Sequence, residues 1–325
     1  MKAVLIDETT HQLYLGQADD PVMSDTDLLV NIKATALNRA DLLQKRGLYP
    51  PPEGASPILG MEMAGVVEQV GSKVSGWKAG DRVCALLPGG GYAERVSIPA
   101  GMAIRIPDTF TYEEAAAIPE VFLTAYLNLF LLGGLKPKQT VLIHAGASGV
   151  GTAAIQLVLE AGAASIVTAG NNEKRNACLQ LGASRTIDYK AGPFAPMVME
   201  ATQGKGVDII LDFIGAAYWE ENLKSLAVDG RLILIGMMGG SKVKELDLGL
   251  LLRRRLQVIG TTLRSKSPEE KIRLTEQFTA FALPLFEKGN LKPVIDSIWD
   301  WEQANKAHEH MEQNKNTGKI ILRIQ

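Results

Sequence analysis

Cysteine and histidine are scarce in this chain of 325 residues, which has only 2 cysteines and 4 histidines. Two cysteines are too few for a disulfide framework or a thiolate metal cage. The longest apolar run, residues 122–135, is too short and too interrupted by glycine to span a bilayer. At a net charge of −2 no basic face points to nucleic acid. No signal peptide is recognisable, so we expect a cytoplasmic globular protein.

The most informative stretch that is present is VLIHAGASGVGTAAIQL, residues 141–157. An apolar strand pattern meets a glycine-rich turn, and a helix pattern follows, as in the dinucleotide fingerprint G-x-G-x-x-G. Glycine lets a phosphate approach the backbone, and the N-terminus of the helix attracts it. A plain structural turn is the alternative. The expected pyrophosphate site consists of Gly146, Ala147, Ser148, Gly149, Val150 and Gly151.

The next strand pattern, SIVTAG at 165–170, indicates which dinucleotide binds. Binders of NAD usually end this strand with a carboxylate that holds the ribose 2′-hydroxyl. Here the strand ends in Gly170 and Asn171, and Lys174 and Arg175 follow. Two cations, and the absence of a carboxylate at the end of this strand, favour binding of NADP, with its 2′-phosphate, over NAD. The alternative is that both cations are ordinary solvated side chains at the start of a helix.

Two kinds of patterning divide the chain. Residues 1–110 contain short strand patterns separated by glycine, proline and aspartate, with a helix pattern at 38–47 and an irregular loop at 49–57. From about residue 120 to 260, six strand patterns alternate with helix patterns, which predicts a doubly wound parallel sheet. The last strand pattern, residues 318–325, fits no further strand–helix unit. We assign it to the β-rich domain.

The predicted fold class is therefore α/β, with a Rossmann-type sheet beside a β-rich domain. The β-rich domain comprises residues 1–120 and is completed by 265–325, while the nucleotide-binding domain comprises 121–264. The basic run Arg253-Arg254-Arg255 follows an apolar helix pattern. We interpret it as a helix end rather than an anion site.

Motifs along the whole chain resemble the medium-chain dehydrogenase/reductase superfamily, and within it the zeta-crystallin-like quinone oxidoreductases. The motifs that carry this resemblance are ALNRADLLQKRGLYP, ILGMEMAGVVEQVG, GDRVCALLPGGGYAE, HAGASGVGTAAIQL and GKIILRI. LDFIGAAYWEENL and MEQNKNTGKI are similar to the branch named for induction by a tumour suppressor. The resemblance implies a GroES-like domain, an active site in a cleft between the domains, and a homodimer. The dimer would pair along the strand near RLILIGMMGG, an edge otherwise left open.

Three departures from the zinc alcohol dehydrogenases of this superfamily concern the metal. Those enzymes bind catalytic zinc through two cysteines and a histidine, and the corresponding positions here are Asn38, Met61 and Glu120. Zinc prefers thiolate or imidazole ligands and usually has three protein ligands in a catalytic site. We therefore expect no metal. The role of Glu120 stays open.

Loss of the metal limits the reaction, because nothing would then stabilise an alkoxide during hydride abstraction from an alcohol. An electron-poor acceptor needs less help, so the resemblance implies NADPH-dependent reduction of a quinone, by hydride or by single electrons. An enoyl or alkenal reductase is one alternative. A protein that binds NADPH with little turnover is another.

The resemblance also implies the site residues. Asn38, Tyr49 and Thr124 match substrate positions, and no catalytic acid is assigned. The alternative for Tyr49, which precedes three prolines, is that it anchors the loop. Tyr189 joins Gly170, Asn171 and Lys174 at the 2′-phosphate. Phe213 and Ile214 border the adenine or ribose, with core packing as the alternative for Phe213 and for Met237 and Met238. The nicotinamide is expected to contact Met237, Met238, Thr262, Leu263, Arg264 and Ser265.

Overall fold

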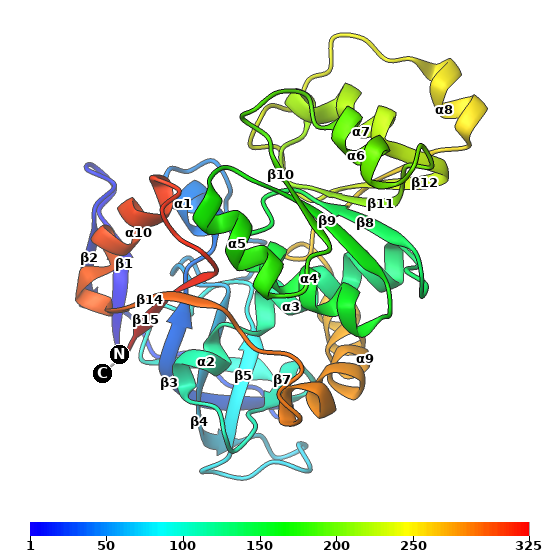
Figure 1. The fold of residues 1–325 in the computed structure, drawn as a ribbon. Helices are drawn as coiled ribbons and strands as arrows, with labels where there is room; N and C mark the ends of the chain where they lie inside the picture. The colour runs from blue at the N-terminus through cyan, green and yellow to red at the C-terminus, as the bar shows by residue number, and fades with distance from the viewer. Residues whose placement is uncertain (325) are drawn as a thin grey trace. The chain divides into compact units, whose positions relative to one another are not determined.

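The computed structural model describes residues 1–324, which form two compact units (Figure 1). One unit combines Met1–Leu123 with residues 263–324, and the other is Thr124–Thr262. The chain therefore leaves the first unit once and returns to it. The predicted α/β class, with a parallel sheet and a separate β-rich unit, is confirmed.

The first unit is built mainly from antiparallel strands. Its strands are β1 (Lys2–Ile6), β2 (Leu13–Gln17), β3 (Asp27–Ala36), β4 (Glu62–Val70), β5 (Arg82–Leu86), β6 (Arg95–Pro99), β7 (Ala103–Arg105), β14 (Ile295–Asp300) and β15 (Lys319–Arg323). Its helices are α1 (Arg39–Lys45), α2 (Tyr112–Ala116), α9 (Pro268–Glu287) and α10 (Ala304–Glu312), and α3 (Pro119–Tyr126) begins in it.

The C-terminal strand completes the sheet of this first unit, as the sequence predicted. The strand order is β14-β15-β3-β4-β5-β7, and β6 also pairs with β3. β15 runs antiparallel to β3, with Ile321 opposite Ala36, and parallel to β14. Four of its five residues are buried, so the strand adds apolar surface to the core as well as ladder hydrogen bonds.

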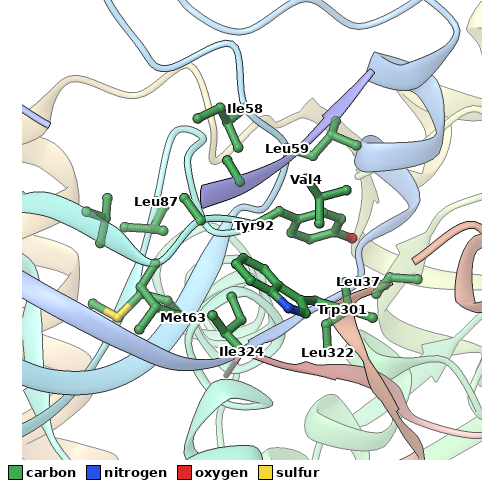
Figure 2. Packing of buried hydrophobic residues seen from close by; sticks show 14 of the residues in the cluster. Val4, Leu37, Ile58, Leu59, Met63, Leu87, Tyr92, Trp301, Leu322 and Ile324 are labelled. Carbon is green, nitrogen blue, oxygen red and sulfur yellow. The ribbon is translucent and has the colours of Figure 1, made fainter. Parts of the chain in front are cut away.

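The core of the first unit joins both ends of the chain. Figure 2 shows the rings of Tyr92 and Trp301 at the centre of a cluster of labelled apolar side chains. Val4 comes from β1 and Leu322 from β15, and both are buried in this cluster. Large aromatic side chains contribute most of the buried area in such a core. The C-terminal segment is thus part of the unit's packing.

The second unit contains the predicted parallel sheet of six strands. The strands are β8 (Thr140–Ile143), β9 (Ala164–Ala169), β10 (Arg185–Asp188), β11 (Val207–Asp212), β12 (Leu226–Leu234) and β13 (Gln257–Gly260), in the order β10-β9-β8-β11-β12-β13. The helices are α4 (Gly149–Glu160), α5 (Asn172–Gln180), α6 (Ala195–Ala201), α7 (Trp219–Ser225) and α8 (Leu248–Arg254). The central strands are buried along almost their whole length, as expected for a sheet covered on both faces.

One sequence-based expectation about this sheet was wrong. The strand RLILIG belongs to β12, which lies between β11 and β13 and is not an open edge. The edge strand is β13, because residues 257–260 form a sixth parallel strand beside β12. The arginine run is a helix end, as predicted. α8 ends at Arg254, and Arg255 takes a left-handed conformation and pairs with Asp229 at 2.6 Å.

Within residues 1–324, no helix has both the length and the apolar character required to cross a membrane.

Candidate functional site

The glycine-rich turn lies at the carboxyl end of β8, directly before α4. Ser148 is the N-cap of α4, and its Oγ accepts a 3.1 Å hydrogen bond from Gly151 N. A Cβ on Gly151 would lie 2.5 Å from the carbonyl oxygens of Ala145 and Gly146, so only glycine fits at this position. Ala145 has a φ of 49°, a left-handed conformation that is uncommon for non-glycine residues.

The first N–H groups of α4 are arranged to bind an anion. Thr152 N donates to Ser148 O, and Gly151 N is taken by the serine side chain. The preceding N–H groups, of Gly149 and Val150, have no acceptor within the helix, because no residue lies four positions earlier in it. These groups and the helix dipole can bind a pyrophosphate.

The end of β9 brings Gly170, Tyr189 and Lys190 together. A Cβ on Gly170 would lie 2.9 Å from Tyr189 Oη and 3.1 Å from Lys190 Cε. Lys190 was missed by the sequence reasoning, although it directly follows Tyr189 in the chain. Its proximity to Gly170 arises from the pairing of β10 with β9, which places Asp188 beside Ala169.

The two cations expected after β9 differ in their surroundings. The guanidinium of Arg175 forms a 2.6 Å ion pair with Asp188, so its charge is already matched by an acid. Lys174 N donates 2.8 Å to Asn171 Oδ1, which caps α5. Arg175 is therefore less suited to an added phosphate than the sequence suggested.

The remaining residues expected at the cofactor lie after β11, β12 and β13. Phe213 and Ile214 are half-buried, and Ile214 N donates 2.7 Å to Asp212 Oδ1. Met237 and Met238 are 64% and 54% exposed, so core packing is wrong for both methionines. Because Phe213, Ile214, Met237 and Met238 follow parallel strands of the second unit, they belong to the carboxyl edge of its sheet, where open α/β sheets bind ligands. Leu263, Arg264 and Ser265 belong to the first unit.

Several buried polar side chains next to this edge of the sheet form a hydrogen-bonded network. His144 Nε2 lies 2.7 Å from Asn222 Oδ1, and Asn222 Nδ2 donates 3.0 Å to Asp212 Oδ2. His144 Nδ1 lies 3.0 Å from Thr168 Oγ1. Burial lowers the pKa of His144 to about 4, so the ring is neutral at neutral pH. These hydrogen bonds connect His144, which directly follows β8, with β9, β11 and α7. They fix the loop that begins at Phe213.

In the first unit, the predicted substrate residue Asn38 belongs to a buried ionic cluster. Asn38 Nδ2 donates 2.8 Å to Glu62 Oε1, and Asn38 Oδ1 accepts a 2.7 Å bond from Lys319 Nζ. Lys319 Nζ also lies 2.7 Å from Glu62 Oε1. Asp41 Oδ2 accepts 2.7 Å from Asn38 N, and burial raises the pKa of Asp41 to about 6. Both ends of Asn38 are thus held in place.

This cluster does not suit zinc. Two residues at the positions that correspond to zinc ligands are poor ligands here. The side chain of Asn38 is hydrogen-bonded to Glu62 and Lys319, and Met61 offers only a thioether. Glu120 N donates 2.9 Å to Glu62 Oε2. The ammonium of Lys319 already supplies the positive charge beside the Glu62 carboxylate. Within the described part of the chain, no group of three or more histidine, cysteine, aspartate or glutamate side chains is arranged to hold a metal.

The structure brings the predicted substrate residue Tyr49 together with Arg264. The guanidinium carbon of Arg264 lies 5.2 Å from the centre of the Tyr49 ring. Arg264 is buried, while its neighbours Thr262 and Ser265 are exposed. Thr124 belongs to the second unit and is buried there, where its carbonyl oxygen accepts a 2.8 Å bond from Asn128 Nδ2.

Comparison with known proteins agrees with this architecture. Residues 24–108 match the family model described as "Alcohol dehydrogenase GroES-like domain", and residues 149–280 match "Zinc-binding dehydrogenase". The human synaptic vesicle membrane protein VAT-1 homolog is 33% identical over 94% of this chain and 81% of its own length. The bovine quinone oxidoreductase-like protein 2 is 28% identical over 99% of this chain and 92% of its own length.

Solved structures are similar over the whole chain. A Pseudomonas syringae quinone oxidoreductase is 30% identical, with a TM-score of 0.88 and full coverage of both chains. The Escherichia coli quinone oxidoreductase complexed with NADPH is 30% identical, with a TM-score of 0.85 over 99% of both chains. The CurF ER cyclopropanase from curacin A biosynthesis is 27% identical, with a TM-score of 0.86 over 100% of this chain and 99% of that one.

A GroES-like unit joined to a doubly wound sheet with a phosphate-binding turn defines a dinucleotide-dependent oxidoreductase. The chain belongs to the medium-chain dehydrogenase/reductase superfamily. Its relatives and structural neighbours include proteins of the quinone oxidoreductase type.

Proposed function

We propose that the protein is an NADPH:quinone oxidoreductase that works without a bound metal. The observation that carries the proposal is the pairing of an intact dinucleotide turn with a cluster at Asn38 that is unsuited to zinc. The turn supplies the N-terminus of α4, and the cluster has the ammonium of Lys319 beside Glu62. An oxidoreductase so built requires an acceptor that needs no Lewis acid.

The cofactor of this reaction is NADPH, which supplies a hydride when bound. The pyrophosphate would lie on residues 146–151, and the 2′-phosphate would lie among Gly170, Asn171, Lys174 and Tyr189, with Lys190 as an added contact. Phe213 and Ile214 would border the adenosine, and the nicotinamide would contact Met237, Met238, Thr262, Leu263 and Ser265. The described residues fit this cofactor, since Gly151 keeps the turn tight and the turn leads directly into the N-terminus of α4.

The acceptor is a quinone because its reduction makes the fewest demands on the protein. A quinone receives a hydride readily, and its anionic product takes a proton from solvent, so no strong general acid is required. The protein's contribution is then to orient the two reactants and to exclude water. Asn38, Tyr49 and Thr124 are the proposed substrate contacts, and a one-electron route to the same product would use the same contacts.

A second candidate is reduction of an activated alkene, and the similarity to the CurF ER cyclopropanase favours it. Initial rates with naphthoquinone, benzoquinone, a crotonyl thioester and hydroxynonenal distinguish the two candidates. We expect kcat/KM for the quinones to exceed that for the alkenes by at least about tenfold, a barrier difference of ~1.4 kcal/mol. The reverse preference would replace quinone reduction with alkene reduction. Tight NADPH binding without reduction of any acceptor would indicate a nucleotide-binding protein instead.

We also propose a cytoplasmic homodimer that pairs through the edge strand β13. Val258 on this strand is 39% exposed, and Leu248 and Leu252 on α8 are 65% and 79% exposed. An unpaired strand edge with exposed apolar neighbours is a common site of chain association. Two copies related by a twofold axis would cover both features on each chain.

A further inference from the structure

Arg264 is a buried cation that forms no ion pair with an acid among residues 1–324. Its Nε donates 2.9 Å to Pro88 O, and its Nη2 donates 2.6 Å to Gln44 Oε1. Its third nitrogen, Nη1, is buried and has no hydrogen-bond acceptor among residues 1–324. The side chain is only 7% exposed. Buried charged groups normally have every donor satisfied, so an unpaired donor here requires an explanation.

The surroundings of Arg264 add a second cation and no bound anion. Lys271 is also buried, and its Nζ donates 2.7 Å to the carbonyl oxygen of Arg264. Asp41 acts on Arg264 only over a longer range, since its oxygens accept bonds from Asn38 N and Gly60 N. The two cations would stabilise negative charge on an oxygen atom near Nη1. They are opposed in part by Asp41, which acts on Arg264, and by Glu270, which acts on Lys271.

Tyr49 is the side chain most directly associated with this guanidinium. Its ring lies over Arg264 at 5.2 Å, and it belongs to the proline-rich segment 49–57. A tyrosine ring can stack on a flat aromatic substrate and on a guanidinium in the same way. A quinone that displaces or slides along this ring would bring a carbonyl oxygen to the unpaired Nη1.

We propose that Nη1 of Arg264 binds the carbonyl oxygen of the acceptor and stabilises the negative charge that develops there, with Tyr49 as the movable cover. This inference rests on the proposed function. It assigns Arg264 a contact with the acceptor instead of the contact with the nicotinamide that the sequence predicted. In this step the quinone receives a hydride, with its two electrons, from NADPH, which becomes NADP⁺. One oxygen of the quinone then carries the negative charge as a phenolate. A solvent proton then completes the hydroquinone.

The test compares Arg264→Gln with Arg273→Gln, which removes an exposed arginine from α9. Loss of an oxyanion donor costs about 100-fold or more in rate. We expect that loss in kcat/KM for quinones with Arg264→Gln, with a larger loss for weaker oxidants. The dissociation constant for NADPH should stay within about twofold, and Arg273→Gln should match the wild type in both quantities.

Two further measurements keep the inference testable if Arg264→Gln folds poorly. Gln44→Glu places a carboxylate against Nη2, so it should raise Tm while lowering kcat/KM for quinones. Para-nitrophenol, which needs no turnover, should bind the wild type as its coloured phenolate and bind Gln44→Glu mostly as the colourless phenol. Unchanged quinone kinetics in Arg264→Gln and Gln44→Glu, or a parallel loss of NADPH affinity, would overturn the role of Arg264. A wild type that reduces no acceptor yet binds the phenolate would instead overturn the proposed function alone.

Discussion

Replacement of Lys319 with methionine tests what stabilises the buried cluster around Asn38. The ammonium of Lys319 donates 2.7 Å bonds to Leu37 O and Asn38 Oδ1 and lies 2.7 Å from Glu62 Oε1. An ammonium has three N–H donors, so all of them are used. Methionine is similar in length but has no charge and no donor. The carboxylate of Glu62 would then stay buried without its cation, which costs about 3–5 kcal/mol.

Thermal and urea unfolding of Lys319→Met should show this cost as a fall of roughly 6–20 °C in Tm, at about 2–4 °C for each kcal/mol. Lys306→Met removes an exposed lysine from α10 and should change the free energy of unfolding by less than about 0.5 kcal/mol. Adding Glu62→Gln to Lys319→Met removes both charges and should restore roughly 0.5–3 kcal/mol. If Lys319→Met were as stable as Lys306→Met, the carboxylate would have to be neutralised in another way, and the assigned cluster would be wrong.

Three further predictions concern the cofactor, pH and assembly. Lys174→Ala should weaken NADPH binding about tenfold, ~1.4 kcal/mol, and leave NADH binding unchanged. Fluorescence titration with Lys205→Ala as the matched control checks this, and an equal loss for NADH would contradict the assigned phosphate site. Burial lowers the pKa of His144 to about 4 and of His308 to about 3, so the unfolded chain takes up protons first as pH falls below about 6.5. The free energy of unfolding should fall by up to about 1.4 kcal/mol per pH unit for each histidine. Asp41, whose pKa burial raises to about 6, opposes part of this fall between about pH 6 and 4, because its folded form takes up a proton first. A flat profile in urea unfolding would refute this reasoning. Val258→Lys at the edge strand should convert a dimer to a monomer in light scattering, whereas an unchanged mass would exclude β13 as the interface.

The strand and helix order was predictable because it depends on local patterns. Alternating strand and helix patterns between about 120 and 260 gave the parallel sheet, and the glycine spacing gave the turn before α4. The return of the last strand followed from its lack of a partner helix. The edge of the sheet was not predictable in the same way, since the order in which strands lie side by side depends on pairing between distant segments, such as β12 with β13.

The site was predictable only where its residues lie close in the sequence. Lys319 and Asn38 are 281 positions apart, and Arg264 and Gln44 are 220 apart, so no spacing rule brings either pair together. The ion pair of Arg175 on α5 with Asp188 on β10 depends on how the helix packs against the strand. The resemblance indicated that Asn38, Met61 and Glu120 correspond to zinc ligands, but only the fold shows that an ammonium lies beside the carboxylate of Glu62.

The central claim is that electrons pass from NADPH to a quinone without a metal ion. The most direct measurement combines elemental analysis of purified protein with stopped-flow oxidation of NADPH by naphthoquinone, before and after treatment with a chelator. The account predicts substoichiometric zinc and an unchanged rate after chelation. One zinc ion per chain, together with loss of the rate on chelation and its recovery on adding zinc, would contradict it.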